Sequence, residues 1–331
     1  MSEASGAMVE AVVVSNWEHG VGAVSKGIDV LRRGGSALDA VEAGICSVED
    51  DPTATSVGTG GTPNIEGILE LDASIMVGNI HRAGAVTGLT MTRNPISVAR
   101  KVMELCPHVM LSGEGARRFA RACGFAEYDP LTQGAKERWA TLRKKLAEAM
   151  AGTFPFESYD EAVGYDSGAM ALAKGVQLLV KSGQIEHLGT VGTLCVDGSG
   201  MLVAGTSTSG LPLRLPGRVA DSSVIGAGTY ASEDGAASST GIGEYVIKHS
   251  LTRVVCQKMG EGLDPTSACE EALRQMVRRE RVDHIIGLIA LDRKGEVGGA
   301  YISNEKRRFR FQYQRMSERE MTVVQPSPVL P

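Results

Sequence analysis

Hydroxyl side chains are concentrated in two neighbouring runs in the second half of the chain. The run GTVGTLCV at 189–196 carries Thr190 and Thr193, and the run LVAGTSTSG at 202–210 carries Thr206, Ser207 and Thr208. Both runs have the apolar pattern of strands, which are built mainly from Val, Ile and aromatic residues. So many hydroxyls in such strands indicate a reactive site.

Thr190 is the hydroxyl best placed to become a nucleophile. It follows a polar segment and lies between Gly189 and Gly192, where the backbone is poorly constrained and accessible. If the Gly189–Thr190 peptide bond is cut, Thr190 gains a free α-amine with an ordinary pKa of about 8. That amine can act as the base that activates the hydroxyl of the same residue. This chemistry requires no metal ion and no organic cofactor.

The composition excludes several other classes of protein. The chain has 331 residues, of which 43% are hydrophobic, and its 34 Lys and Arg are outnumbered by 39 Asp and Glu. A net charge of −5 leaves no basic excess to neutralise phosphates, so we expect no nucleic-acid partner. The basic run at 305–315 alternates like a strand and is read as a solvated edge.

The cysteines and the apolar runs restrict the chain further. The six cysteines show no C-x-x-C spacing, which argues against a zinc site and against a disulfide framework. No run reaches the roughly 18 apolar residues of a membrane span, and the first residues lack a basic leader. We therefore expect no membrane partner and a cytoplasmic location.

Helices in pairs alternate with antiparallel strands in pairs along the chain, and Ser36 is the expected N-cap of the second helix. This order predicts the α/β class and a four-layer αββα sandwich, rather than a doubly wound parallel sheet. Strands are expected at 8–15, 68–78, 82–89, 190–197, 201–207, 284–292, 296–303 and 308–314, and helices at 21–33, 36–50, 94–106, 112–124, 241–258 and 264–280.

The chain divides into two halves that mirror each other in outline. Residues 1–125 form the first half of the sandwich, and residues 190–331 form the second. Between them, residues 126–189 are charged and poor in β-branched side chains, which predicts a linker that is helical in part and otherwise flexible. We expect the halves to build one structural domain.

Several motifs occur in the order found in a known family. They are GGSALDAVEAG at 34–44, SVGTGGTPNIEG at 56–67, GTVG at 189–192, TSTSG at 206–210 and STGIGE at 239–244. With these motifs the sequence resembles the N-terminal nucleophile hydrolases of the glycosylasparaginase and plant-type asparaginase family. The resemblance implies self-cleavage into an α chain of 1–189 and a β chain of 190–331, and a homodimer of such αβ units.

The resemblance also implies a catalytic role for four residues. Thr190 matches the family's nucleophile, and Thr208 matches the residue that holds the nucleophile's amine and hydroxyl in place. Thr240 and Gly241 match the oxyanion hole, where a hydroxyl and a backbone N–H meet the developing negative charge. From the residues alone, Thr240–Gly241 can equally be the N-terminal cap of a helix.

Four further residues match substrate-binding positions of the family. Arg218 and Asp221 correspond to residues that bind the α-carboxylate and the α-amine, and this pair suits an amino-acid head group. Ser56 and Trp17 match positions typical of glycosylasparaginases, although a Trp after a strand is often a core residue. These matches favour an enzyme that hydrolyses the side-chain amide of N4-(β-N-acetylglucosaminyl)-L-asparagine.

One departure from the pattern favours an alternative. Glycosylasparaginases usually carry Asp directly before the nucleophile, whereas Gly189 stands there, as in isoaspartyl peptidases. The alternative is therefore a β-aspartyl peptidase with L-asparaginase activity, acting on a β-aspartyl peptide or another asparagine derivative. A third reading is an uncut chain that binds amino acids or serves as a scaffold.

Overall fold

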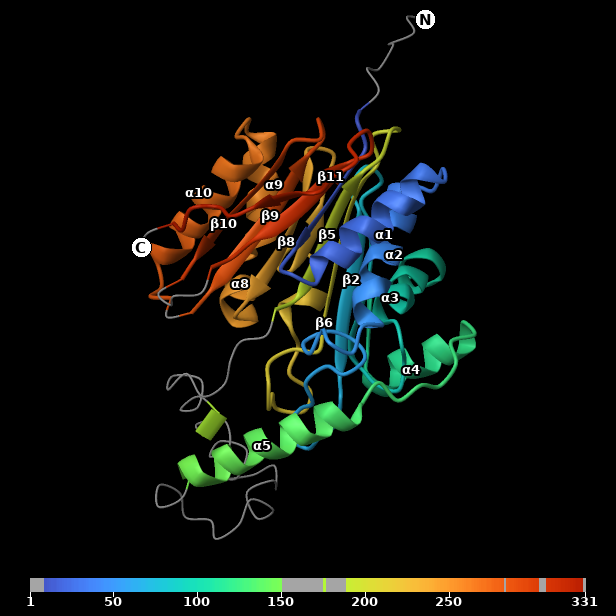
Figure 1. The fold of residues 1–331 in the computed structure, drawn as a ribbon, viewed down its shortest axis with the longest axis vertical. Helices are drawn as coiled ribbons and strands as arrows, with labels where there is room; N and C mark the ends of the chain where they lie inside the picture. The colour runs from blue at the N-terminus through green and yellow to red at the C-terminus, as the bar shows by residue number, and fades with distance from the viewer. Residues whose placement is uncertain (1–8, 151–174, 177–188, 283, 304–307, 330–331) are drawn as a thin grey trace, which may run out of the picture.

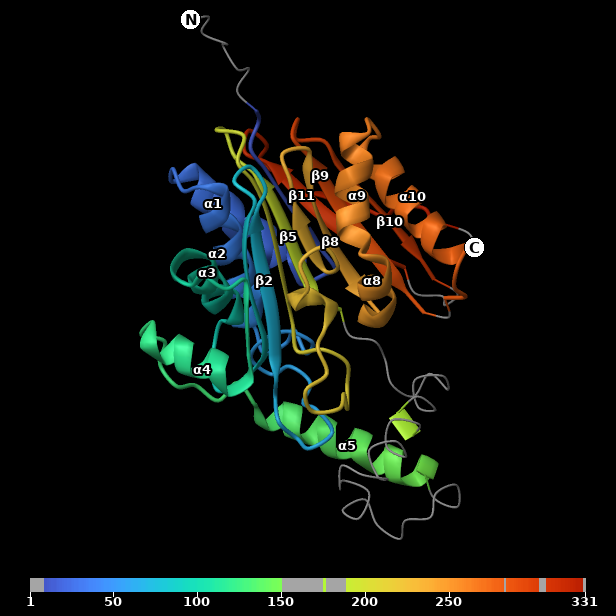
Figure 2. The same ribbon diagram turned by 180° about the vertical axis from the view of Figure 1, so that it is seen from behind.

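The computed structural model describes residues 9–150, 175–176, 189–282, 284–303 and 308–329, and all structural statements below concern these residues. Two β-sheets lie face to face, and helices cover their outer faces (Figures 1 and 2). This mixed α/β arrangement with mainly antiparallel sheets agrees with the fold class expected from the sequence.

The larger sheet has eight strands in the order β12-β11-β1-β5-β6-β2-β3-β4. Every neighbouring pair is antiparallel except β3 and β4, which are parallel. The strands are β1 (Val12–Asn16), β2 (Leu71–Val77), β3 (Arg82–Leu89), β4 (Met110–Ser112), β5 (Val191–Val196), β6 (Leu202–Thr208), β11 (Phe311–Arg315) and β12 (Thr322–Val324).

The smaller sheet has four antiparallel strands in the order β10-β9-β8-β7. One of its two inner strands, β8, is a run of Gly, Ala, Ser and Thr that is almost entirely buried, and such small side chains let the two sheets approach closely. The strands are β7 (Thr229–Ala231), β8 (Gly235–Gly241), β9 (Ile286–Asp292) and β10 (Val297–Ile302).

Three apolar clusters hold the layers together. One lies between the larger sheet and its helices, one between the smaller sheet and its helices, and one between the two sheets. The first set of helices is α1 (Gly20–Arg32), α2 (Ala37–Glu49) and α3 (Pro95–Leu105), and the second is α8 (Gly243–His249), α9 (Leu251–Gly260) and α10 (Pro265–Val277) (Figure 1).

Helices α4 (Gly113–Ala122) and α5 (Gln133–Met150) lie at one end of the molecule (Figure 1). The helical part expected between the two halves is α5, which is held against the loop between α2 and β2 by a hydrogen bond from Trp139 Nε1 to the Asn64 carbonyl at 3.0 Å. Most of the expected linker, 151–174 and 177–188, lies outside the described residues.

Strands of the two halves share the larger sheet, because β1 of the first half lies between β5 and β11 of the second. One expectation from the sequence was wrong. The single helix expected at 241–258 is instead the end of β8, followed by α8 and α9 with a break at Ser250, whose φ is 47°. The small residues of β8 have little strand propensity, and their pairing with β9 decides their conformation.

Glu49, at the C-terminal end of α2, is fully buried beneath the larger sheet. Its carboxyl accepts hydrogen bonds from Ser207 Oγ at 2.6 Å and from the Ile96 backbone N–H at 3.1 Å. Burial nevertheless raises the pKa of Glu49 from 4.5 to about 8, because desolvation of the charge outweighs these bonds. Glu49 is therefore protonated at neutral pH and joins α2, α3 and β6 as a neutral group.

The raised pKa of Glu49 predicts how stability depends on pH. Between pH 4.5 and about 8 the folded protein binds a proton that the unfolded chain releases, so this group's contribution to the free energy of unfolding falls as pH rises. Glu49→Gln, which resembles the protonated form, should therefore gain stability relative to the wild type between pH 5 and pH 8 in urea unfolding. Glu66→Gln, at an exposed carboxylate, is the control, and an equal pH dependence of wild type and Glu49→Gln would contradict the prediction.

Candidate active site

Thr190 directly precedes β5 at the end of the larger sheet. It is buried, with 5% of its surface exposed, and the β5–β6 register pairs Val191 with Ser207. Continued by one residue, this register places Thr190 opposite Thr208, the last residue of β6. The Thr190 hydroxyl forms no hydrogen bond with any other described residue, so it is not engaged in holding the fold together.

Thr240, in β8 of the smaller sheet, contacts Thr190 at the end of the larger sheet. The backbone N–H of Thr190 donates to Thr240 Oγ1 at 3.2 Å, and the indole N–H of Trp17 donates to the same oxygen at 2.9 Å. Because Thr240 Oγ1 accepts both of these bonds, its own proton remains to be donated. Gly241, with φ of 121° and the Ile285 carbonyl against its α-carbon, ends β8 in a conformation that a side chain would strain.

Glycines flank Thr190 because side chains of other elements occupy the space beside them. A Cβ atom on Gly189 would lie 2.6 Å from the Trp17 ring, and one on Gly192 would overlap the hydroxyl of Ser238 in β8. The N–H of Gly192 donates to Asn16 Oδ1 at 2.7 Å, at the end of β1. The chain on either side of Thr190 is therefore held closely on both faces.

Thr208 and Ser56 lie side by side. The Thr208 hydroxyl donates to the Ser56 carbonyl at 3.3 Å and accepts from the N–H of Gly210 at 3.0 Å. The N–H of Ser209 also donates to the Ser56 carbonyl, at 2.8 Å. The loop after α2 is thus attached to the end of β6, which carries Thr208.

Arg218 and Asp221 lie together in the loop between β6 and β7. Arg218 makes a two-point contact with Glu244, at 3.0 and 3.1 Å, and Ser239 Oγ donates to Asp221 Oδ2 at 2.9 Å. Burial raises the pKa of Asp221 to about 6, although the nearby Arg218 opposes this shift. A Cβ atom on Gly243 would meet both the Asp221 carboxylate, at 2.7 Å, and the Arg218 guanidinium, at 2.9 Å, so the charged groups converge beside this glycine.

The structure thus places the expected residues in three groups. The central group consists of Gly189, Thr190, Trp17, Thr240 and Gly241. The second group consists of Thr208 and Ser56, and the third consists of Arg218 and Asp221. Thr190, Thr208 and Thr240 are joined through β5, β6 and their immediate contacts. Among the described residues no direct hydrogen bond joins the Arg218–Asp221 pair to Thr190.

A cavity of about 420 Å³ opens beside Gly189. Sequence reasoning missed His19 and Asp51, which line this cavity, and Asn16 on the opposite side of the chain. The polar run SNWEHG, directly after an apolar strand, was the available signal, since it interrupts the hydrophobic pattern at the end of β1. The described residues that line the cavity are Trp17, Glu18, His19, Asp51, Thr53, Ala54, Thr55, Ser56 and Gly189.

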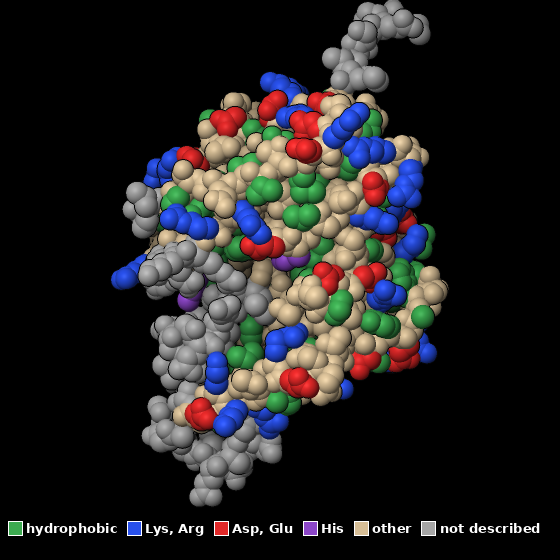
Figure 3. Space-filling model, viewed as in Figure 1, with side chains coloured by type: hydrophobic (Ala, Val, Ile, Leu, Met, Phe, Trp, Pro, Cys, Tyr) green, Lys and Arg blue, Asp and Glu red, His purple; other side chains and the backbone are tan. Residues whose placement is uncertain are grey.

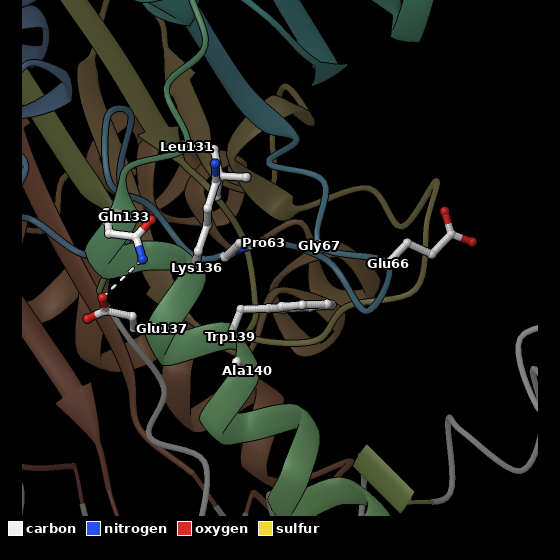
Figure 4. A pocket seen from close by; sticks show the side chains of 9 residues that line it. All are labelled: Pro63, Glu66, Gly67, Leu131, Gln133, Lys136, Glu137, Trp139 and Ala140. Atoms are coloured by element: carbon white, nitrogen blue, oxygen red, sulfur yellow. Dashed lines mark hydrogen bonds between the residues drawn. The ribbon is translucent and has the colours of Figure 1, made fainter. Parts of the chain in front are cut away.

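A second cavity, of about 470 Å³, lies between α5 and the loop around Pro63 and Gly67. Figure 4 shows the Trp139 ring beneath this loop and Gln133 bonded to Glu137, while Glu66 points away. Its lining is mainly apolar and includes neither Thr190 nor any of the other expected site residues. The cavity beside Gly189 is therefore the better candidate for chemistry.

The described residues offer no alternative site based on a metal ion. Among them, no three His, Cys, Asp or Glu side chains are grouped so as to hold a metal ion. No helix in the described part of the chain is both long enough and apolar enough to cross a membrane. On the face seen in Figure 3, acidic and basic side chains are interspersed, without a broad patch of one sign.

Comparison with known proteins decides the family. The model of a family described as "Asparaginase" matches residues 7–322. The chain belongs to this asparaginase family of N-terminal nucleophile hydrolases.

Relatives of several kinds are similar to this asparaginase-family chain. A plant-type L-asparaginase of Pyrococcus furiosus is 43% identical over 278 residues, which is 84% of each chain. An N(4)-(β-N-acetylglucosaminyl)-L-asparaginase of Elizabethkingia miricola is 38% identical over 300 residues, 88% of this chain and 79% of the relative. A human isoaspartyl peptidase/L-asparaginase is 36% identical over 277 residues, 83% and 80% of the two chains.

The packing around Gly192 predicts the cost of adding a methyl group there. Gly192→Ala should lower the free energy of unfolding by about 1–3 kcal/mol, because the new Cβ must displace Ser238 from its place in β8. Gly115→Ala, at a helical position where a Cβ meets nothing within 4 Å, is the matched control and should be neutral or stabilising. Urea unfolding of both variants and of the wild type tests this. If Gly192→Ala were as stable as the wild type, the two sheets would be able to move apart at Gly192 at little cost in free energy.

Proposed function

We propose that the chain cuts its own Gly189–Thr190 bond and then hydrolyses the side-chain amide of L-asparagine and of β-aspartyl peptides. The observation that carries the proposal is the meeting of Thr190 with Thr240 and Trp17, which leaves the Thr190 hydroxyl free at the start of β5. The family and the similarity to asparaginases and isoaspartyl peptidases support this choice of substrate over a glycosylated asparagine.

Thr190 supplies the nucleophile. Once cleavage has freed its α-amine, the amine takes the proton of the Thr190 hydroxyl, and Oγ1 attacks the amide carbon of the substrate. Thr208, opposite Thr190 in the sheet and fixed by Ser56, holds the nucleophile in place. The resulting ester is hydrolysed by water, which releases aspartate and restores Thr190.

Thr240 and Gly241 stabilise the oxyanion. The Thr240 hydroxyl already accepts two hydrogen bonds, so its proton is available to the oxygen on which charge develops. Trp17 fixes the orientation of this hydroxyl through its indole N–H and closes one side of the cavity over Gly189.

Arg218 and Asp221 hold the amino-acid head group. The contact with Glu244 uses Nε and Nη2 of Arg218, so the remaining N–H groups of the guanidinium can bind an α-carboxylate. The Asp221 carboxylate, when ionised, accepts from the α-ammonium of the substrate. Ser56 lines the cavity on the side of the leaving group. The cavity has a volume of about 420 Å³, which admits a leaving group larger than ammonia.

The proposal includes the organisation of the mature protein. The chain forms one structural domain, a four-layer αββα sandwich of the N-terminal nucleophile type, made of an α chain of 1–189 and a β chain of 190–331. The order of helices, sheets and three apolar clusters supports the sandwich. Two such αβ units are proposed to form a homodimer.

Removal of the nucleophile should abolish cleavage. Thr190→Ala is expected to remain at full length because no hydroxyl attacks the Gly189 carbonyl, whereas the wild type yields a fragment that begins Thr-Val-Gly. Intact mass and N-terminal sequencing after long incubation measure this. Thr141→Ala, on the exposed face of α5, is the control and should cleave like the wild type. An uncut wild type would instead favour the scaffold reading.

Removal of Arg218, which is proposed to bind the α-carboxylate of the substrate, should weaken substrate binding. Arg218→Ala is expected to lower kcat/KM by about 10- to 100-fold, mainly through KM, because a charge-assisted hydrogen bond is lost. Steady-state kinetics on L-asparagine, a β-aspartyl dipeptide and glycosylasparagine measure the effect and rank the substrates. A preference for glycosylasparagine would instead indicate that the protein is a glycosylasparaginase.

The pKa of Asp221 predicts the acid limb of the pH profile. Below pH 6 this carboxyl is protonated and no longer pairs with the substrate ammonium, so kcat/KM of the cleaved enzyme should fall as pH decreases through about 6. Asp221→Asn should have low activity without this acid limb. An unchanged limb in the variant would assign the titration to another group.

A further inference from the structure

The uncut chain lacks the base that the mature enzyme uses. Before cleavage, the Thr190 nitrogen is part of a peptide bond, and it donates its only proton to Thr240 Oγ1 at 3.2 Å. An amide nitrogen has no basic lone pair, so it cannot accept the proton of the Thr190 hydroxyl. The first attack, on the Gly189 carbonyl, therefore needs a proton acceptor from elsewhere in the structure.

Among the described residues, three titratable side chains line the cavity beside Gly189, namely Glu18, His19 and Asp51. Glu18 is 67% exposed and pairs with Arg310 at 2.9 Å, which draws it toward solvent. Asp51 Oδ1 accepts from both the N–H and the hydroxyl of Thr53, at 2.9 and 2.7 Å, as the turn after α2 requires. Both carboxylates thus have structural partners of their own.

His19 differs from these carboxylates in two respects. Its Nε2 atom is buried and has no hydrogen-bond partner in the described part of the chain, although a buried polar atom without a partner is costly in a fold. Its ring also interacts with the backbone of Thr190, the residue that must be activated.

The protonation state of His19 suits a base. Burial lowers its pKa from 6.5 to about 4, and this effect outweighs the Thr190 backbone and the carboxylates of Glu18 and Asp51, which favour the charged ring. The imidazole is therefore neutral at physiological pH, with a lone pair available on one ring nitrogen.

We propose that His19 is the proton acceptor that starts self-cleavage. The imidazole takes the Thr190 hydroxyl proton, directly or through one water, as Oγ1 bonds to the Gly189 carbonyl carbon. The bond from that carbon to the Thr190 nitrogen then breaks, and the imidazolium returns the proton to the departing amine. Water hydrolyses the resulting ester, leaving a carboxylate on Gly189 and a free amine on Thr190. This inference rests on the proposed self-cleavage.

The role of His19 ends with the cut. The released α-amine of Thr190 becomes the nearer base, and His19 remains as part of the wall of the cavity. His19 thus acts in making the enzyme, and Thr190 alone supplies the base for turnover.

The test follows cleavage of freshly synthesised chain, so that uncut protein is present at the start. Cell-free synthesis with a short pulse of labelled Met, followed by gel and intact-mass analysis, gives a rate constant for appearance of the 190–331 fragment. His19→Gln and His19→Ala should cleave about 100-fold more slowly or worse, the usual contribution of a general base. His108→Gln, at an exposed His before β4, is the matched control and should cleave at the wild-type rate.

Added imidazole separates a chemical role from a structural one. It should restore cleavage of His19→Ala, where the ring has left a space, and should have no effect on Thr190→Ala. Circular dichroism and thermal unfolding of the purified variants report whether the fold is retained.

Each outcome decides one question. Cleavage of both His19 variants within threefold of the wild type would overturn the assignment of His19, as would slow cleavage in a folded His19→Ala that imidazole does not restore. A wild type that stays uncut would instead overturn the proposed self-cleavage itself. Slow cleavage of both variants together with rescue by imidazole would establish His19 as the base.

Discussion

The contact between the two sheets at Thr240 is the constraint on which the site depends. The backbone of Thr190 reaches across from the larger sheet and donates to this hydroxyl, and Trp17 donates to it from the end of β1. Three segments far apart in the sequence are thereby held at one oxygen atom. The close approach is possible because β8 carries small side chains and because Gly192 makes room for Ser238.

Packed apolar layers lie on both sides of this contact. Apolar clusters on the outer faces of both sheets bury the helices, and a third cluster fills the space between the sheets. Buried polar groups in these layers differ in charge: Arg214 and Asp72 form a buried ion pair, whereas burial raises the pKa of Glu49 to about 8 and so favours its neutral form. A charged network at that position would be costly, whereas hydrogen bonds to a neutral carboxyl join α2, α3 and β6 without this cost.

In the proposed mechanism, Thr190 takes part in two kinds of chemistry. Substrate hydrolysis needs a nucleophile with its own amine, an oxyanion donor and a charged pair for the head group, which Thr190, Thr240 and the Arg218–Asp221 pair supply in the proposed mechanism. Self-cleavage has to precede this, when the amine is still an amide. In the proposal, these two demands account for the His19 imidazole, whose Nε2 has no partner among the described residues, in the wall of a cavity beside Thr190, which later carries its own base.

The sequence by itself determined the α/β class, nearly all strands of the larger sheet, and the local signals that need only neighbouring residues. The N-cap Ser36, the glycines around Thr190 and the hydroxyls of β5 and β6 are examples. Apolar periodicity and turn chemistry act over a few residues, so a single sequence records them directly. The motifs around Thr190 likewise indicated the family.

Only the tertiary structure decided which segments meet. The position of β1 between β5 and β11 and the formation of β8, a strand that the sequence pattern did not indicate, depend on pairing between residues distant in the chain. The raised pKa values of Glu49 and Asp221 and the lowered pKa of His19 have the same origin, because burial is a property of the whole packed molecule. Sequence patterns record what each residue prefers locally, whereas these features depend on what surrounds each residue after the sheets have packed.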